Sequence, residues 1–325
     1  MNSHVTSGLE RTRTRPRDER GLEIVSSLGV RTISKGSGFT SLGIVRAQDG
    51  EDDSKNGTLG EITRRKFLAM SASGVALSSC ASVPQADPYG GFRMSMESWC
   101  VRNFPLDRML AAYKELGLNY AEIYPHKGQL EATADPEKLR VYREKLKAVD
   151  LAAWGVWVDI TKDEAKGRAG MEFARALGAR VAPGGISPDG FETADRLTKE
   201  FGIPFALHNG GRSKIDDIAR SLEKWPTAVG VCVDTGNFIQ AGEDPIRAIR
   251  VLGPRIHAVH LKDSDGKVMS TVMGRGKLDL VGSLRALREV GFKGLLSLEY
   301  EQNPDDPMAD LKECLAKIRE AIQKL

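Results

Sequence analysis

The sequence predicts an α/β protein with a single (β/α)8 TIM barrel over residues 91–325, after a disordered leader and a signal segment. Eight short apolar runs alternate with amphipathic segments, and His, Asp and Glu residues collect where the apolar runs end. The region after the leader has the usual size of one such barrel, about 250 residues. No Gly-x-Gly-x-x-Gly follows the first run, so a dinucleotide-binding open sheet is disfavoured.

The predicted strands are short apolar runs, as expected when both faces of a strand are buried. They span residues 93–97, 119–124, 151–158, 180–184, 203–208, 229–233, 256–261 and 294–299. The predicted helices span residues 106–116, 136–149, 163–177, 190–201, 214–224, 245–252, 281–290 and 308–325. Gly117 and Gly178 are expected to end two of these helices, because glycine is common at a left-handed helix C-terminus. Eight such units fit a closed barrel better than an open sheet.

Residues 1–60 show no apolar periodicity and are rich in Arg, Ser, Thr and Gly. Such a segment buries too little apolar surface to offset the entropy of ordering it. We therefore expect a disordered N-terminal extension, or a start codon assigned upstream of the true one. Residues 81–90 are expected to be a linker.

Residues 61–80 resemble a twin-arginine export signal. Arg64 and Arg65 precede Lys-Phe-Leu and a short, weakly apolar run. The run 67–79 is too short for a transmembrane helix, which needs about 20 residues. The final Leu-Ser-Ser-Cys resembles a lipobox, which implies lipidation of Cys80. The resemblance implies passage through the twin-arginine export machinery to the periplasm, with a lipid anchor as the only membrane attachment; cleavage without lipidation is the alternative.

Charge and cysteine content exclude some functions. Residues 1–80 hold 12 of the 47 Lys and Arg and 9 of the 44 Asp and Glu, so the remainder carries 35 of each. A domain without a basic excess is not expected to bind nucleic acid. The four Cys show no Cys-x-x-Cys spacing, which disfavours a cysteine-based zinc site. Nothing in the sequence indicates the oligomeric state.

Polar residues follow the predicted strands, and barrel active sites lie at the carboxyl ends of strands. His208, Asp234, His260 and Glu299 end four consecutive strands. Alone, such an Asp is more often a helix cap and such a His a core residue. Together, two His and two carboxylates match the ligands of a hard or borderline divalent ion. We therefore predict a metal site formed by these four residues.

Four segments resemble the sugar phosphate isomerase/epimerase family, the xylose isomerase-like barrels. They are residues 116–124, 233–245, 257–263, and 274–276 with 297–300. The resemblance implies one divalent ion (Mn, Co, Mg or Zn) at the four-residue site and a small carbohydrate as substrate. The sequence departs from the family pattern at His208, where catalytic members usually have Glu, and at Asn237, which replaces a His.

The family chemistry is an isomerisation or epimerisation that begins with proton removal next to a carbonyl and passes through an enediolate. Glu299 is the first candidate for the base, and His208 is the second. Lys262 is expected to stabilise negative charge, or else to pair with a neighbouring Asp in a loop. Glu122 is expected to orient hydroxyls, or else to pair with a cation inside the barrel mouth. The predicted substrate-binding residues are Trp99, Tyr124, Trp157, Asn209, Asn237, Asp263 and Arg275.

The sequence is compatible with two other functions and disfavours a third. One is a lyase or hydrolase of keto-glycosides, which uses the same proton chemistry. Another is a carbohydrate-binding lipoprotein without catalysis, because one of the usual Glu is missing. The third, an endonuclease IV-like repair enzyme, is disfavoured because only four His follow the signal, too few for its trinuclear zinc site.

Overall fold

A computed structural model describes residues 87–325 of the chain. The predicted extension, the export signal with Arg64 and Arg65, the lipidation site Cys80 and most of the linker lie outside these residues. Within the described part, no helix is both long enough and apolar enough to cross a membrane.

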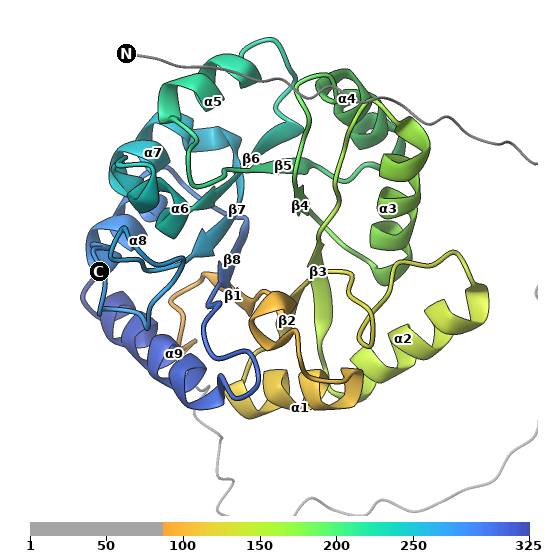
Figure 1. Ribbon diagram of the computed structural model, residues 1–325, viewed down its shortest axis with the longest axis horizontal. Coiled ribbons are helices and arrows are strands. Elements are labelled where there is room, and N and C mark those ends of the chain that lie inside the picture. Colours follow the sequence, from red (N-terminus) through yellow and green to blue (C-terminus); the bar gives the residue numbers. More distant parts are fainter. Residues whose placement is uncertain (1–86) are drawn as a thin grey trace, which may run out of the picture. The chain divides into compact units, whose positions relative to one another are not determined.

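Eight strands lie at the centre of the described region, and the helices surround them (Figure 1). The strands are β1 (Arg93–Met96), β2 (Tyr120–Ile123), β3 (Ala152–Val156), β4 (Ala182–Gly184), β5 (Phe205–His208), β6 (Val229–Asp234), β7 (Ile256–Leu261) and β8 (Leu295–Leu298). The long helices are α1 (Leu106–Leu116), α2 (Pro136–Ala148), α3 (Glu164–Leu177), α4 (Phe191–Phe201), α5 (Ile215–Leu222), α7 (Pro245–Leu252), α8 (Leu280–Glu289) and α9 (Met308–Ile322). Each predicted strand and helix is present, with bounds that differ by a few residues.

All strand pairs are parallel. Six strands form one sheet in the order β1-β8-β7-β6-β5-β4, and β2 pairs with β3. Single parallel bridges, Glu97 to Glu122 and Gly155 to Val181, join these two groups on either side. The strands therefore follow one another in a ring, as Figure 1 shows, and the predicted TIM-barrel fold is confirmed.

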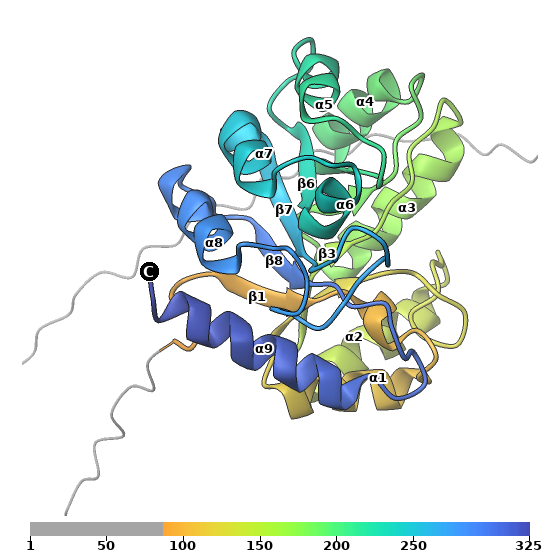
Figure 2. The same ribbon diagram turned by 60° about the vertical axis from the view of Figure 1, so that its left-hand side comes forward.

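Three short helices were not predicted: η1 (Ser98–Val101), α6 (Thr235–Gln240) and η2 (Gly253–Arg255). Helix α6 begins directly at the end of β6, where the Asp234 side chain accepts a hydrogen bond from the Asn237 N–H at 2.9 Å. Such one-turn helices are too short to show an apolar period. Figure 2 shows α6 at the strand ends, apart from the outer ring of helices.

Two glycines end helices as predicted. Gly117 after α1 has φ 69° and Gly178 after α3 has φ 87°. Both backbones are in the left-handed region that residues with a Cβ rarely adopt. The chain can therefore turn directly from each helix into the next strand.

An apolar layer fills the inside of the barrel below the strand ends. It is formed by one residue from each of four strands and by the residue before β4: Ala206, Cys232, Ala258, Leu295 and Val181. Tyr120 and Trp154 pack against this layer. Because strand side chains alternate between the two faces, the residues two positions further along each strand also point inward. That alternation places the next inward layer at the carboxyl ends of the strands.

Candidate metal and active site

The second inward layer is polar. Two residues further along four of the strands lie His208 on β5, Asp234 on β6, His260 on β7 and Ser297 on β8. Glu299 follows two residues after Ser297. The register places Asp234 beside His260 and His260 beside Ser297. The cluster is therefore a consequence of strand pairing between segments far apart in the sequence.

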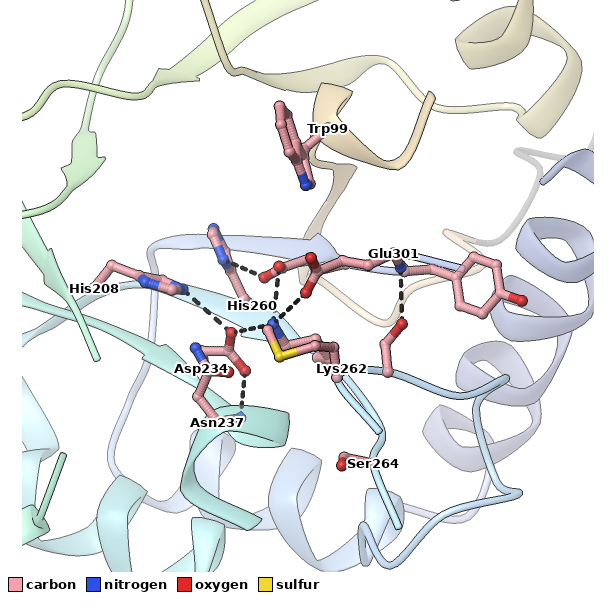
Figure 3. A network of polar contacts seen from close by, with 12 residues as sticks. Trp99, His208, Asp234, Asn237, His260, Lys262, Ser264 and Glu301 are labelled. Atoms are coloured by element: carbon pink, nitrogen blue, oxygen red, sulfur yellow. Dashed lines mark hydrogen bonds and ion pairs between the residues drawn. The ribbon is translucent and has the colours of Figure 1, made fainter. Parts of the chain in front are cut away.

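The four predicted metal-ligating residues come together. One potential ligand atom from each of His208, Asp234, His260 and Glu299 lies within 4.8 Å of the others. His208 Nε2 is 3.2 Å from Asp234 Oδ2, and His260 Nδ1 is 2.7 Å from Glu299 Oε2 (Figure 3). Asp234 and His260 are fully buried, and only a small part of the His208 side chain reaches the surface.

Two buried atoms of the cluster have no hydrogen-bond partner. They are His260 Nδ1 and Glu299 Oε2, which contact each other as an ion pair at 2.7 Å and have no other polar partner. A buried polar atom without a partner costs about 1–3 kcal/mol, and such atoms are rare in native proteins. An imidazole nitrogen and a carboxylate oxygen are both ligands of divalent metals. The residues therefore fit a metal ion that both atoms contact.

Lys262 lies beneath the cluster as a buried ammonium group. Its Nζ is 2.7 Å from Asp234 Oδ2, 2.9 Å from Glu299 Oε1 and 3.0 Å from Glu301 Oε1 (Figure 3). Burial lowers the pKa of Lys262, but the three carboxylates outweigh it and raise that pKa above its usual value. Lys262 contacts Oε1 of Glu299, whereas Oε2 faces His260 Nδ1.

The ionisable groups around the site shift one another's pKa values. Burial opposes a charge on His260, yet Cys232, Glu122, Glu97 and Glu299 together raise its pKa well above the usual range. For Glu299, burial acts to raise the pKa, but Lys262 and His260 lower it well below its usual value. Glu299 is therefore ionised at neutral pH, as a metal ligand must be.

Asn209 and Asn237 form hydrogen bonds with the backbone around Asp234. Asn209 Oδ1 accepts from the Asp234 N–H at 2.7 Å, and Asn209 Nδ2 donates to the Asp234 carbonyl at 3.1 Å. Asn237 Nδ2 donates to the Asn209 carbonyl at 2.8 Å, while its buried Oδ1 has no partner. Both residues were predicted to bind substrate, and the structure places their amides mainly in contact with the backbone around Asp234.

Aromatic rings border the cluster. The Trp157 ring lies 5.1 Å from the His208 ring and 6.3 Å from the His260 ring, and Tyr124 lies 5.5 Å from Trp157. Trp99 packs against Tyr124 at 4.8 Å, and in Figure 3 it stands apart from the polar side chains with its ring directed toward them. Tyr124 and Trp157 also line a cavity of about 400 Å³. The three predicted aromatic residues therefore lie beside the candidate metal site.

Two predicted substrate-binding residues lie elsewhere. Asp263 is buried and accepts hydrogen bonds from the backbone N–H groups of Ser264, Gly274, Gly276 and Leu278. It organises the loop that follows β7. Arg275 lies on the surface and pairs with Glu313 of α9 at 2.7 Å. Neither side chain contacts the cluster.

Glu122, predicted to orient hydroxyls, is fully buried and contacts a histidine of the cluster. Its Oε1 lies 2.7 Å from His260 Nε2, and Ser297 Oγ donates to its Oε2 at 2.5 Å. Glu122 therefore contacts a candidate metal ligand directly.

Three residues of the site were not singled out from sequence: Glu97, Ser297 and Glu301. Burial, with a further contribution from Glu299, raises the pKa of Glu97 well above its usual value. Glu97 ends the first predicted strand, so its position was the available signal. Ser297 lies on β8, whereas Glu301 lies beyond its end and contacts Lys262 Nζ at 3.0 Å.

The fold and the cluster define a class of protein: a (β/α)8 barrel with a candidate divalent-metal centre at the carboxyl ends of its strands. The chain belongs to the xylose isomerase-like TIM barrel family, whose profile matches residues 110–321.

The chain is also similar to individual proteins, some by sequence and some by fold. An inosose dehydratase of Clostridium tetani is 30% identical over 157 residues, which cover 42% of this chain and 52% of that protein. The chain spans about half the length of the curated relatives it matches. A D-tagatose 3-epimerase-like protein has the same fold, with TM-score 0.59, 16% identity, and coverage of 72% of this chain and 99% of that one. The IolI protein with a bound zinc atom matches with TM-score 0.55, 17% identity, and coverage of 72% and 96%.

Proposed function

We propose that the barrel is a divalent-metal-dependent sugar isomerase or epimerase. The observation that carries the proposal is the pair of buried, unpartnered atoms His260 Nδ1 and Glu299 Oε2 within the four-residue cluster. Asp234, His260 and Glu299 would hold the ion, and His208 lies beside them in the same cluster. The names of the relatives, which include an inosose dehydratase and an epimerase-like protein, support a sugar or a related polyol as substrate.

A bound divalent ion supplies Lewis acidity, which makes a C–H next to a carbonyl easier to deprotonate. The chain supplies the rest. Lys262 places a fixed positive charge beside Asp234 and Glu299, so the negative charge of the site is held in a fixed arrangement before substrate arrives. The Trp157 and Tyr124 rings offer apolar faces on which a sugar ring can stack.

The proton-transfer role falls to Glu299 or His208. Glu299 Oε2 is the unpartnered oxygen, but the low pKa of Glu299 makes it a weak base and favours its role as a ligand. His208 has one ring nitrogen at Asp234 and a partly exposed side chain beside Trp157. We therefore assign His208 as the base and Glu299 as a ligand.

The test is proton exchange with solvent. The protein is loaded with Mn²⁺, Co²⁺, Mg²⁺ or Zn²⁺ in turn and incubated in D₂O with a panel of keto-sugars and keto-polyols. NMR is expected to show deuterium next to the carbonyl together with an isomer or epimer of unchanged composition. No exchange with any metal and substrate would favour a carbohydrate-binding protein without catalysis.

A lyase acting on a keto-sugar, keto-polyol or keto-glycoside is the second candidate. His208 in place of the usual Glu favours it, because a two-Glu proton exchange across the substrate carbon is not available. The dehydratase names of the sequence relatives favour it as well. In the same experiment this reaction would show exchange together with loss of water or of the glycosidic substituent, which mass spectrometry detects.

We further propose that the chain is exported through the twin-arginine pathway and anchored by a lipid at Cys80. The resemblance of residues 61–80 to such a signal supports this proposal. Cell fractionation of the wild type and of an Arg64→Lys/Arg65→Lys variant tests export. Mass spectrometry of the N-terminal peptide tests lipidation, and a mature protein that retains residues 2–40 would contradict both.

A further inference from the structure

Glu122 is connected to the cluster only through a histidine. Its carboxyl group is fully buried, contacts His260 Nε2 at 2.7 Å and lies on the opposite side of the ring from Glu299. The two ring nitrogens of His260 thus face two different carboxyl groups. Only the Glu122 contact has hydrogen-bond geometry.

Three local features direct the Glu122 side chain toward His260. Ser297 Oγ donates to Glu122 Oε2 at 2.5 Å, so the other oxygen is the one that faces the ring. The pairing of β2 with β3 shifts register between Ala121 and Glu122, which brings Gly155 of β3 opposite Glu122. Gly155 on β3 leaves the necessary space, because a Cβ there would lie 3.1 Å from Glu122 Cγ and 2.8 Å from Leu295 Cδ2.

A neutral histidine has one N–H and one lone pair, and their positions decide which nitrogen can bind a metal. A carboxylate at Glu122 would have only acceptors to offer. When Nε2–H donates to Glu122, the lone pair is on Nδ1, the atom that faces Glu299 Oε2. The opposite tautomer would point an N–H at the metal site and leave two acceptors facing each other at Nε2.

We propose that Glu122 is a positioning residue that, with Ser297 and Gly155, holds His260 as the Nε2–H tautomer and presents Nδ1 to the metal. The inference rests on the metal site of the proposed function. Carboxylates that orient a ligating histidine commonly change metal affinity 10–100-fold when they are replaced. Glu122 is therefore assigned the role of orienting a metal ligand rather than of contacting the sugar.

The experiment compares wild type, Glu122→Gln and Glu122→Leu. The Kd for Co²⁺ is measured by competition with a chelator, the coordination by the Co²⁺ absorption spectrum, and the His260 tautomer by ¹⁵N NMR of the Zn²⁺-loaded protein. Glu122→Leu is expected to weaken Co²⁺ binding about 10–100-fold and to change the spectrum. Glu122→Gln keeps an acceptor oxygen without the charge, so we expect an intermediate Kd.

Serine variants supply the matched control. Ser297→Ala removes the hydroxyl that directs Glu122 and is expected to weaken Co²⁺ binding in the same direction by a smaller factor. Ser283 on α8 is equally buried, and its hydroxyl has no hydrogen-bond partner. Ser283→Ala is expected to leave the Co²⁺ Kd and spectrum unchanged.

The outcomes separate the two proposals. If wild type binds Co²⁺ and folded Glu122→Leu binds it equally well with the same spectrum, the positioning role is overturned and the metal site stands. If wild type binds no divalent ion, the metal site itself fails. Should Glu122→Leu not fold, unchanged ¹⁵N shifts and an unchanged Kd in both Glu122→Gln and Ser297→Ala would overturn the inference.

Discussion

His260 Nδ1 and Glu299 Oε2 lie 2.7 Å apart in the barrel interior, and neither atom has a further polar partner. The two residues are on neighbouring strand ends, and each is already held on its other side, His260 by Glu122 and Glu299 by Lys262. The two remaining ligand atoms, His260 Nδ1 and Glu299 Oε2, thus point at the same place.

Replacement of His260 or Asp234 by Ala is expected to abolish metal retention. Each variant removes one ligand from the cluster and leaves the others buried. Metal content is measured by atomic emission after dialysis against a low metal concentration. His257→Ala is the matched control, because His257 is on the same strand but bonds the Thr227 carbonyl at 2.7 Å, away from the cluster. Full metal retention in both His260→Ala and Asp234→Ala would contradict the site.

Metal addition is expected to raise the thermal stability of the wild type. A ligand at 100 times its Kd stabilises the folded state by about 2.7 kcal/mol. For a domain of this size the corresponding rise in Tm is about 5–11 °C. Differential scanning calorimetry with and without EDTA measures it. The same metal should leave the Tm of His260→Ala unchanged, and an equal rise in both proteins would point to binding elsewhere.

Metal binding is expected to release a proton at neutral pH. The pKa of His260 is raised well above its usual value in the metal-free protein, so its ring is protonated there, and a ligating nitrogen must lose that proton. Affinity should consequently fall as the pH is lowered. Isothermal titration calorimetry in buffers of different ionisation enthalpy counts the protons released. A binding enthalpy that is the same in every buffer would be inconsistent with this reading.

Lys262→Met is expected to make folding depend on metal. The variant leaves Asp234, Glu299 and Glu301 without their shared ammonium, and loss of one partner from a buried ion pair costs about 3–5 kcal/mol. A divalent ion restores part of the missing positive charge. Urea unfolding with and without Mn²⁺ should show a larger stabilisation by Mn²⁺ in the variant than in wild type. Equal stabilisation would show that Lys262 and the metal act on separate charges.

Trp157→Phe is expected to raise the KM for sugar substrate with a smaller effect on metal affinity. The indole ring lies beside His208 and His260, and a smaller ring offers less stacking surface. The loss is about 0.5–1.5 kcal/mol, or about 2- to 10-fold in KM. Trp225→Phe is the control, since Trp225 stacks on Phe191 outside the site. A matching change in both variants would indicate a general loss of stability.

Local sequence patterns were sufficient to predict much of the fold. The apolar runs, the amphipathic periods and the two helix-ending glycines predicted every long helix and strand in order, because these signals depend on neighbours within a few residues. The one-turn helix α6 carries no period and was missed, although Asp234 at its start is a recognisable cap. Strand-end positions likewise indicated the four residues of the candidate metal site.

Partners across the barrel were not predictable from sequence. Glu122 and His260 are 138 residues apart, and their contact depends on the register of several strand pairs, including the shift between β2 and β3 at Glu122. The same holds for Lys262 with Glu301. Strand alternation is a local property, so the sequence by itself determined which side chains point inward. Register is set by the packing of the whole barrel, so only the tertiary structure decided which of those side chains meet.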